Sequence, residues 1–250
     1  MIENFYQLHP KTYDEQFWWK KDDVEFWKNL FFNSEASILE LAAGTGRIGV
    51  PLLKENNNYL GLDISSSYCN YANQKILDSF SEPKFFNFDM TDFQFDENFD
   101  IIFIPFNSLL HLPEKKDLLQ CFDSVKKHMH SKSKFYIDIF VPSPLFLYRP
   151  KDVAVPVMEF FNSRKECETY VDEIIDYDKK NEIAQIIWMY KNEESYYDEI
   201  TFSMKMYYPD TMVNILNECG FTICNIWGDY EKNSFDETSN KQIYECKIKG

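Results

Sequence analysis

The chain has 250 residues, of which 44% are hydrophobic and 18% aromatic, so it can bury a large core as one domain. Its formal net charge of −15 would repel phosphate backbones and no stripe of Lys or Arg appears, so no nucleic-acid partner is expected. No apolar run approaches about 18 residues, and the N-terminus lacks a basic segment followed by an apolar one, so neither a membrane partner nor a signal peptide is expected.

The six cysteines form no Cys-x-x-Cys pair and show no spacing typical of metal ligands. Several of them lie within apolar strand or helix patterns, as reduced core cysteines of cytoplasmic proteins do. The sequence therefore predicts a cytoplasmic location and no metal site.

The first predicted elements are helices between residues 11 and 32, which are rich in Phe and Trp. Aromatic side chains at this density favour packing against a core. We therefore expect residues 1–35 to form an N-terminal helical cover.

The most informative segment follows, at residues 38–46. An apolar strand carrying one carboxylate, Glu40, runs into a turn of small residues and then into a helix. Gly44 and Gly46 permit backbone dihedrals closed to other residues, and they remove side chains that would keep a ligand away from main-chain N–H groups. The start of the following helix adds unpaired donors. The turn is therefore a candidate ligand-binding site.

Gly44, Gly46 and Gly49 also spell G-x-G-x-x-G, the pattern of nicotinamide and flavin dinucleotide sites. Glu40 argues against such a site, because a carboxylate four residues before the first glycine would repel a pyrophosphate at the helix start. The same carboxylate suits a ligand with positive charge, such as the ammonium and sulfonium groups of S-adenosylmethionine. The pattern Glu-x-Ala-x-Gly-x-Gly resembles the signature of class I S-adenosylmethionine-dependent methyltransferases.

The next two predicted strands are each followed by an acid. Residues 58–63 end in Asp63, which could accept both hydroxyl groups of a ribose in either cofactor. Residues 84–88 are followed by Asp89 and Met90, to which the resemblance assigns contacts with the adenine amino group and the adenine ring. Each acid taken alone could merely cap the next helix.

The fourth predicted strand, residues 99–104, leads into the segment from Pro105 to Leu112. This segment resembles the one that flanks the transferable methyl group in small-molecule methyltransferases. The candidate residues thus follow four successive strands at their carboxyl ends, the edge at which open α/β sheets bind ligands.

Two residues are candidates for the methyl-transfer step. Tyr13-Asp14 matches a dipeptide that lies over the cofactor in related small-molecule methyltransferases. His111 is the predicted general base because imidazole has an ordinary pKa near neutrality, although a histidine at a helix start can also cap or pack. Tyr13 and His111 are therefore the predicted catalytic residues. The predicted cofactor-binding residues are Tyr13, Glu40, Ala42, Gly44, Thr45, Gly46, Arg47, Asp63, Ile64, Asp89, Met90, Pro105, Phe106 and Asn107.

An insertion is predicted after the fifth strand, residues 134–140, because prolines at 142, 144 and 150 interrupt regular structure. The segments that follow alternate between apolar and polar residues, which is typical of strands. We therefore expect residues 141–207 to form an antiparallel β insertion over the substrate pocket. Its strands are expected at residues 168–177, 182–191 and 197–207.

The insertion is also rich in carboxylates. Such a cluster most often forms a solvated face, and the alternative is that it attracts a cationic amine. The acids concerned are Glu166, Glu168, Asp172, Glu173 and Asp176.

Residues 208–250 are expected to complete the domain that begins at residue 36 and is interrupted after residue 140. A helix opened by Pro209 and ended by Gly220 is followed by two strands. The resemblance implies that the last strand runs antiparallel. The predicted fold is α/β, a Rossmann-like sheet of seven mostly parallel strands with helices on both faces.

The predicted function is transfer of a methyl group from S-adenosylmethionine to a small-molecule acceptor, with S-adenosylhomocysteine as the product. An amine is the leading acceptor, because the expected insertion resembles that of amino-sugar and amino-acid N-methyltransferases. An O-methyltransferase stays open, since nothing in the sequence fixes the acceptor atom. Two further candidate functions are a nicotinamide-dependent oxidoreductase, against which Glu40 argues, and non-catalytic binding of S-adenosylmethionine. The protein is expected to be a monomer or a homodimer.

Overall fold

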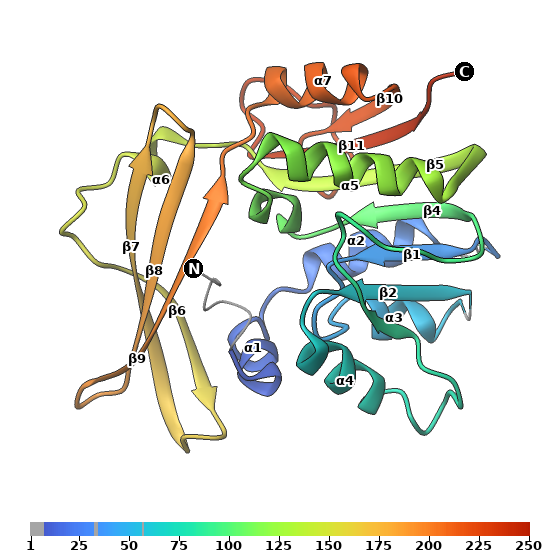
Figure 1. The fold of residues 1–250 in the computed structure, drawn as a ribbon. Coiled ribbons are helices and arrows are strands. Elements are labelled where there is room, and N and C mark those ends of the chain that lie inside the picture. Colours follow the sequence, from blue (N-terminus) through green and yellow to red (C-terminus); the bar gives the residue numbers. More distant parts are fainter. Residues whose placement is uncertain (1–7, 33–34, 57) are drawn as a thin grey trace. The chain divides into compact units, whose positions relative to one another are not determined.

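A computed structural model describes the protein over residues 8–32, 35–56 and 58–250 (Figure 1). The contacts among these residues divide the chain into two units, named here after their sheets. The seven-stranded unit contains residues 21–141 and 207–250.

The four-stranded unit contains residues 142–206 together with the N-terminal residues up to Lys20. The helices expected in residues 1–35 are therefore divided between the two units, and residues 1–7 and 33–34 of that segment lie outside the described residues. No helix in the described part of the chain is long and apolar enough to cross a membrane.

Among the described residues, seven strands form a sheet in the order β10-β11-β5-β4-β1-β2-β3 (Figure 1). The pairs β1–β2, β1–β4, β2–β3 and β4–β5 are parallel, whereas β11 runs antiparallel to both β5 and β10. This arrangement confirms the predicted Rossmann-like sheet with an antiparallel last strand. The strands are β1 (Ile38–Leu41), β2 (Tyr59–Asp63), β3 (Phe85–Asn87), β4 (Phe99–Ile104), β5 (Met129–Phe140), β10 (Phe221–Trp227) and β11 (Lys241–Ile248).

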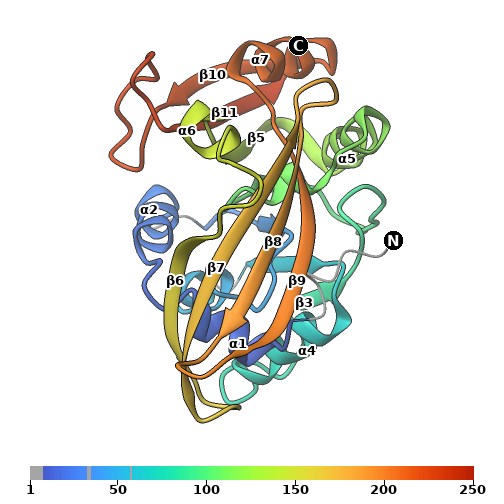
Figure 2. The same cartoon turned by 90° about the vertical axis from the view of Figure 1, so that its left-hand side faces the viewer.

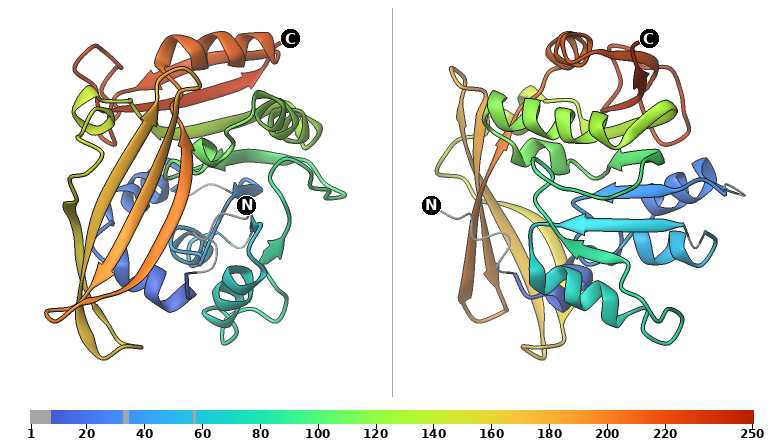
Figure 3. Two further views of the ribbon diagram at one scale, coloured as in Figure 1. Left: turned by 60° about the vertical axis from the view of Figure 1, so that its left-hand side comes forward. Right: turned by 45° about the vertical axis from the view of Figure 1, so that its right-hand side comes forward.

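Some helices of this unit connect parallel strands, and the handedness of each connection determines which face of the sheet its helix covers. Right-handed crossovers put α3 and α4, which connect β1 to β2 and β2 to β3, on one face, and α5, which connects β4 to β5, on the other. Figure 3 shows α5 lying along β5. The helices are α2 (Asp22–Leu30), α3 (Gly49–Leu53), α4 (Ser66–Gln74), the 3₁₀ helix η2 (Ser108–His111), α5 (Lys115–Lys127) and α7 (Pro209–Glu218).

The local sequence explains where these helices begin and end. α7 begins at Pro209 and is followed by Gly220 in a left-handed conformation (φ 82°), as predicted. α5 buries Leu118, Cys121 and Phe122 on one face, at the spacing of an amphipathic helix. α3 and α4 are short, because turns follow them at residues 54–55 and 75–79.

Helix α2 packs against the sheet through Trp27, which is fully buried. Its ring lies 4.8 Å from that of Phe103 on β4 and 6.1 Å from that of Tyr136 on β5. These contacts bury a large apolar area and fix α2 against the centre of the sheet. As a result, the first turn of α2, with Asp23, lies beside the segment that follows β1.

The four-stranded unit is built on an antiparallel sheet in the order β6-β7-β8-β9 (Figure 2). β6 is not among the strands predicted from the sequence, and it contains Pro156, a residue that argues against a central strand. β6 is an edge strand, where a proline is tolerated because one side of the strand needs no donor. The elements of this unit are α1 (Pro10–Gln16), α6 (Pro144–Leu147), β6 (Val155–Asn162), β7 (Cys167–Asp178), β8 (Ile183–Lys191) and β9 (Tyr196–Lys205).

Polar contacts attach helix α1 to this sheet. The Tyr190 hydroxyl on β8 donates to Oε1 of Gln16 at 2.7 Å. The Ser163 hydroxyl, just after β6, donates to Oε1 of Glu15 at 2.5 Å. Helix α1 is thus part of the four-stranded unit, whereas α2 belongs to the seven-stranded one.

Two of the insertion's acids are buried and already have partners. Asp172 accepts from Lys191 at 2.5 Å and from the Tyr196 hydroxyl at 2.7 Å. Glu173 accepts from Arg149 at 2.8 Å and from the indole N–H of Trp188 at 2.9 Å. These two acids are therefore built into the unit and do not form a solvated face.

Candidate active site

The segment that follows β1, residues 42–46, has an unusual backbone. Ala42, Gly44 and Gly46 have φ values of 56°, 57° and 75°, a left-handed region that glycine occupies readily and alanine rarely. This glycine turn lies at the carboxyl end of β1. β2 lies on one side of β1 and β4 on the other, so the turn is at the point where the strand order reverses. Open α/β sheets bind their ligands at such a point.

The two glycines of the turn face different surroundings. A Cβ atom on Gly46 would lie 2.9 Å from the Phe85 ring, 3.0 Å from Val50 and 3.2 Å from Ala72. Among the described residues, a Cβ atom on Gly44 would have only Tyr68 within 4 Å, at 4.0 Å. Gly46 therefore permits close packing inside the unit, while Gly44 keeps open the side from which a ligand would approach.

Glu40 lies on β1 directly before this turn and is buried. The Tyr59 hydroxyl on β2 donates to its Oε2 atom at 2.5 Å. Burial raises the pKa of Glu40 to about 8, against the opposing effects of the Tyr59 hydrogen bond and the nearby Arg47. Near neutral pH, the carboxyl group is thus mostly protonated, and a nearby cation would favour its ionised form.

The third glycine of the G-x-G-x-x-G pattern, Gly49, has a role in this contact. A Cβ atom there would overlap the Tyr59 hydroxyl, and one on Gly61 would lie 2.9 Å from the same oxygen. Both glycines therefore leave room for the hydroxyl that binds Glu40. The spacing that suggests a dinucleotide site instead accommodates a tyrosine.

Asp63, at the end of β2, is buried and holds two loops together. Its Oδ2 accepts from the Gly44 N–H and its Oδ1 from the Ser65 N–H, both at 2.8 Å. Burial raises its pKa to about 6, and the two backbone hydrogen bonds and the field of His111 oppose this shift. The structure thus brings Asp63, Gly44 and His111 close together.

The predicted adenine contacts lie near the surface. Ile64, after β2, is 52% exposed, which is unusual for so apolar a side chain and leaves it available to a ligand. Asp89 is exposed, and its Oδ1 accepts from the backbone N–H of Thr91 at 2.8 Å and from its hydroxyl at 2.7 Å. Met90, next to it, is half-buried.

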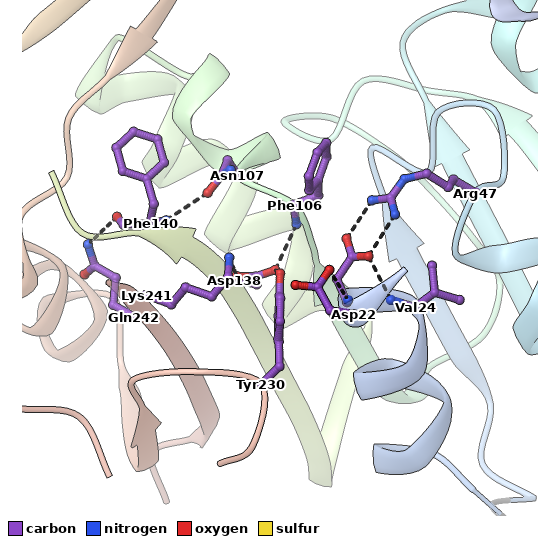
Figure 4. Close-up of polar contacts among 11 residues, drawn as sticks. Asp22, Val24, Arg47, Phe106, Asn107, Asp138, Phe140, Tyr230, Lys241 and Gln242 are labelled. Carbon is purple, nitrogen blue, oxygen red and sulfur yellow. Dashed lines mark hydrogen bonds and ion pairs between the residues drawn. The ribbon is translucent and has the colours of Figure 1, made fainter. Parts of the chain in front are cut away.

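Arg47 follows the glycine turn and forms a two-point ion pair with Asp23 of α2. Its two terminal nitrogens donate to the two oxygens of Asp23 at 2.8 and 2.6 Å, and Asp23 is fully buried. The guanidinium carbon lies 4.5 Å from the centre of the Phe106 ring, within the range of a cation–π contact. Thr45, before it, is fully buried. Figure 4 shows Arg47 and Phe106 facing each other.

A second turn, residues 105–108, follows β4, the neighbour of β1. Pro105 is buried, and Phe106 and Asn107 both have left-handed backbones, with φ values of 53° and 64°. The 3₁₀ helix η2 begins at the next residue and ends at His111. The glycine turn and the segment predicted to flank the methyl group thus follow adjacent strands.

Tyr13, in contrast, lies on α1 in the four-stranded unit. There its ring is 4.8 Å from that of Phe17. The other candidate residues all belong to the seven-stranded unit. The placement of Tyr13 beside a cofactor stays a prediction.

Several residues that support this site are not among those predicted from the sequence. Tyr59 lies on a buried strand and reads as a core residue, and Asp23 lies in a charged helix start that reads as solvated. Asp138 could have been found, because it is a single acid in the apolar half of its strand, residues 135–140. The residues missed are Asp23, Tyr59, Asp138, Tyr230 and Lys241.

Comparison with known proteins agrees with this architecture. The methyltransferase domain family matches residues 38–132. A protein of Bacillus subtilis (strain 168), YqeM, which is named as a methyltransferase, is 25% identical over 97% of this chain and 96% of its own length.

Two solved structures are similar over nearly the whole chain. An S-adenosylmethionine-dependent methyltransferase from Clostridium acetobutylicum ATCC 824 superimposes with a TM-score of 0.78 at 16% identity, over 98% of this chain and 99% of its own. The sugar N-methyltransferase KedS8 from Streptoalloteichus sp. ATCC 53650 gives a TM-score of 0.69 at 12% identity, over 100% and 94%. The matched domain, the strand order and the glycine turn after β1 together support a class I S-adenosylmethionine-dependent methyltransferase.

Proposed function

We propose that the protein transfers the methyl group of S-adenosylmethionine to an amine of a small molecule and releases S-adenosylhomocysteine. The observation that carries this proposal is the buried carboxyl group of Glu40, directly before a turn in which no described residue comes closer than 4.0 Å to the Cβ position of Gly44. A carboxyl group with a pKa near 8 becomes an ionised partner when a cation lies beside it. A ligand with ammonium and sulfonium charges matches this site, and a pyrophosphate does not.

The chain's own residues supply a complementary contact for each part of the cofactor. Glu40 would bind the ammonium group, and the open side of Gly44 would admit the amino-acid portion. Each oxygen of Asp63 accepts one backbone N–H, which leaves lone pairs for the two ribose hydroxyls. Ile64 would cover the adenine ring and Asp89 would accept from its amino group.

When bound, S-adenosylmethionine supplies an electrophilic methyl group. The remaining work for the protein is to align the acceptor with that methyl group, to exclude water and to accept a proton. His111, at the end of η2 and within electrostatic reach of Asp63, is the candidate that would take the proton from an amine. Tyr13 is proposed to contact the acceptor side.

The likeness of fold to a sugar N-methyltransferase supports an amine acceptor. The charge of −15 would also favour approach of a cationic molecule over an anionic one. Within the four-stranded unit, Asp172 and Glu173 are already paired with Lys191 and Arg149, so they are not assigned to the acceptor. A hydroxyl acceptor is the second candidate, because the fold likeness does not fix the acceptor atom.

The proposal predicts binding of S-adenosylmethionine and S-adenosylhomocysteine in the micromolar range and no comparable binding of NAD. Isothermal titration calorimetry with the three ligands measures this directly. Turnover should then be measured as S-adenosylhomocysteine formed with a panel of amines, each paired with the hydroxyl compound of the same skeleton. Tighter binding of NAD would refute the cofactor assignment, and turnover confined to the hydroxyl compounds would refute the amine.

His111→Ala is expected to lower kcat by about 100-fold, the usual contribution of a general base, with a small change in the Kd of S-adenosylmethionine. The wild-type rate with an amine should rise with pH through an ionisation that is absent in the variant. His130→Ala is the matched control, because His130 pairs with Asp100 at a half-exposed site and should leave kcat unchanged. A variant that melts early yet turns over normally once folded would assign His111 to packing.

A further inference from the structure

The turn that follows β4 holds two adjacent residues in a conformation that few side chains adopt. Phe106 and Asn107 have φ values of 53° and 64°, and neither is glycine. Consecutive left-handed residues cost free energy and persist only where the surrounding structure holds them. Such outliers are concentrated at functional sites, so the contacts that hold this turn indicate what it does.

Asp138, on β5, makes most of these contacts. Ile104 of β4 pairs with Ile137 of β5, so Asp138 lies beside the start of the turn. Its carboxylate Oδ2 accepts from the Phe106 N–H at 3.3 Å, and its backbone carbonyl accepts from the Asn107 N–H at 2.9 Å. One residue therefore binds the backbone N–H of both left-handed residues.

The side chain of Asn107 closes the turn from the other direction. Its Oδ1 atom accepts from the Phe140 N–H at 2.8 Å, two residues beyond Asp138 on β5. The Phe140 carbonyl in turn accepts from the side-chain amide of Gln242 at 3.1 Å. Figure 4 shows the contacts of Phe140 with Gln242 and with Asn107. The turn is thus attached to β5 at three points.

The Asp138 carboxylate is itself oriented by two groups from the far end of the chain. The Tyr230 hydroxyl donates to Oδ2 at 2.8 Å, and the Lys241 ammonium donates to Oδ1 at 3.2 Å. The Lys241 nitrogen also lies 4.5 Å from the centre of the Tyr230 ring. Asp138 is fully buried, so these two donors compensate its charge where water cannot. Burial and the Asp138 charge raise the pKa of Tyr230, which therefore stays a donor.

The same turn reaches the glycine turn through Phe106. Its ring packs against the guanidinium of Arg47, which is fixed in place by Asp23. The two turns that would lie on either side of the cofactor are therefore joined by side chains, and their separation depends on Asp138 at one end and Asp23 at the other.

We propose that Asp138 is a positioning residue for methyl transfer. With Tyr230 and Lys241, it holds the turn at Phe106 and Asn107 so that the turn contacts the transferable methyl group. The inference rests on the proposed function. It adds residues from β5, β11 and the segment between β10 and β11 to a site that the sequence analysis built from the segments following the first four strands. Asp138 does not touch the acceptor or take up a proton in this proposal.

The proposal is tested by the difference between two ligands that differ only in the methyl group and its charge. In Asp138→Asn, the affinity for S-adenosylmethionine is expected to fall at least fivefold, and that for S-adenosylhomocysteine less than twofold. Tyr230→Phe and Lys241→Met should show the same selectivity to a smaller extent. Calorimetric Kd values for both ligands, with the midpoint of thermal unfolding, are the measurements. Hydrogen exchange of the Phe106 and Asn107 amides should also become faster in Asp138→Asn, while that of the Gly44 amide stays unchanged.

Lys134→Met is the matched control. Lys134 pairs with Glu245 at 2.6 Å and links the same two strands, β5 and β11, next to the far end of their paired stretch. It should change neither Kd value. Equal loss of both ligands in Asp138→Asn, or a lower unfolding midpoint with both affinities unchanged, would show a merely structural role and overturn the inference. A wild-type protein that binds neither ligand would refute the proposed function itself.

Discussion

Gly44→Ala is expected to weaken S-adenosylmethionine binding by at least about tenfold while the protein stays folded, whereas Gly46→Ala is expected to destabilise the fold. Both substitutions add one methyl group to a left-handed position, at about 1 kcal/mol each. On Gly44 the methyl group would meet no described residue closer than Tyr68 at 4.0 Å, and it would enter the space that the cofactor is proposed to occupy. On Gly46 it meets three side chains at 2.9 to 3.2 Å, and such overpacking costs about 1–3 kcal/mol more.

The two variants therefore control for each other. Urea denaturation gives the free energy of unfolding of each, and calorimetry gives the Kd for S-adenosylmethionine. Unchanged affinity in Gly44→Ala would mean that the open space beside this residue is not the cofactor site. Equal losses of stability in the two variants would mean that the packing around Gly46 adjusts more readily than these distances indicate.

Glu40→Gln is expected to lower the affinity for S-adenosylmethionine by about tenfold to a hundredfold, since a hydrogen bond to a charged group contributes about 1.5–3 kcal/mol. The wild-type carboxyl group has a pKa of about 8 in the folded protein, so binding of a cationic ligand near pH 7 should release a proton. Titration in two buffers with different ionisation enthalpies measures that release. Glutamine cannot ionise, so the proton release that is due to Glu40 should disappear in the variant.

The raised pKa of Glu40 also predicts how the stability of the fold depends on pH. The folded pKa of Glu40 is raised above its ordinary value of 4.5, so the folded state holds its proton more tightly than the unfolded state does. Its stabilising effect is complete below about pH 4.5 and is lost as the pH rises towards about 8. Asp63, with a pKa of about 6, contributes with the same sign at lower pH. The window from about pH 6.5 to about pH 8.5 therefore isolates Glu40.

Glu245→Gln is the matched control on β11. Although burial opposes it, hydrogen bonds from Lys134 and Asn225 lower the pKa of Glu245, so its contribution is lost as the pH falls. This variant should leave both cofactor affinity and proton release unchanged. Proton release that persists in Glu40→Gln would assign the ionisation to another group.

The sequence predicts the backbone of the candidate site where one segment determines the geometry. A turn at Gly44 and Gly46 needs left-handed dihedrals, which local residue choice reveals. Asp63 and Phe106 follow parallel strands, so the order of strands suffices to bring them to one edge. The contacts that hold the site cannot be predicted in this way, because they join segments that are distant in the sequence. Asp138 and Lys241 are 103 residues apart, and the residues around either one give no indication that the two side chains are in contact.

Local composition also gives a wrong prediction of burial or secondary structure where a distant segment determines the environment of a residue. Asp23 stands among charged residues and reads as part of a solvated helix start, yet Trp27 fixes its helix against the sheet and Arg47 covers its carboxylate. Pro156 argues against a strand, yet β6 accepts it because the strand lies at an edge. In both cases the prediction would require knowing which segments are neighbours in the folded protein.

The ion pairs Arg47–Asp23 and Lys241–Asp138 restrict how this sequence can diverge. In each pair the acid is fully buried, so losing the base alone would leave an uncompensated charge, at about 3–5 kcal/mol. That is a large part of the stability of an ordinary domain. A descendant that replaces one member therefore needs the other replaced almost at once. Across relatives, positions 23 and 47 should change together, and so should positions 138 and 241, even where the glycine turn between them stays the same.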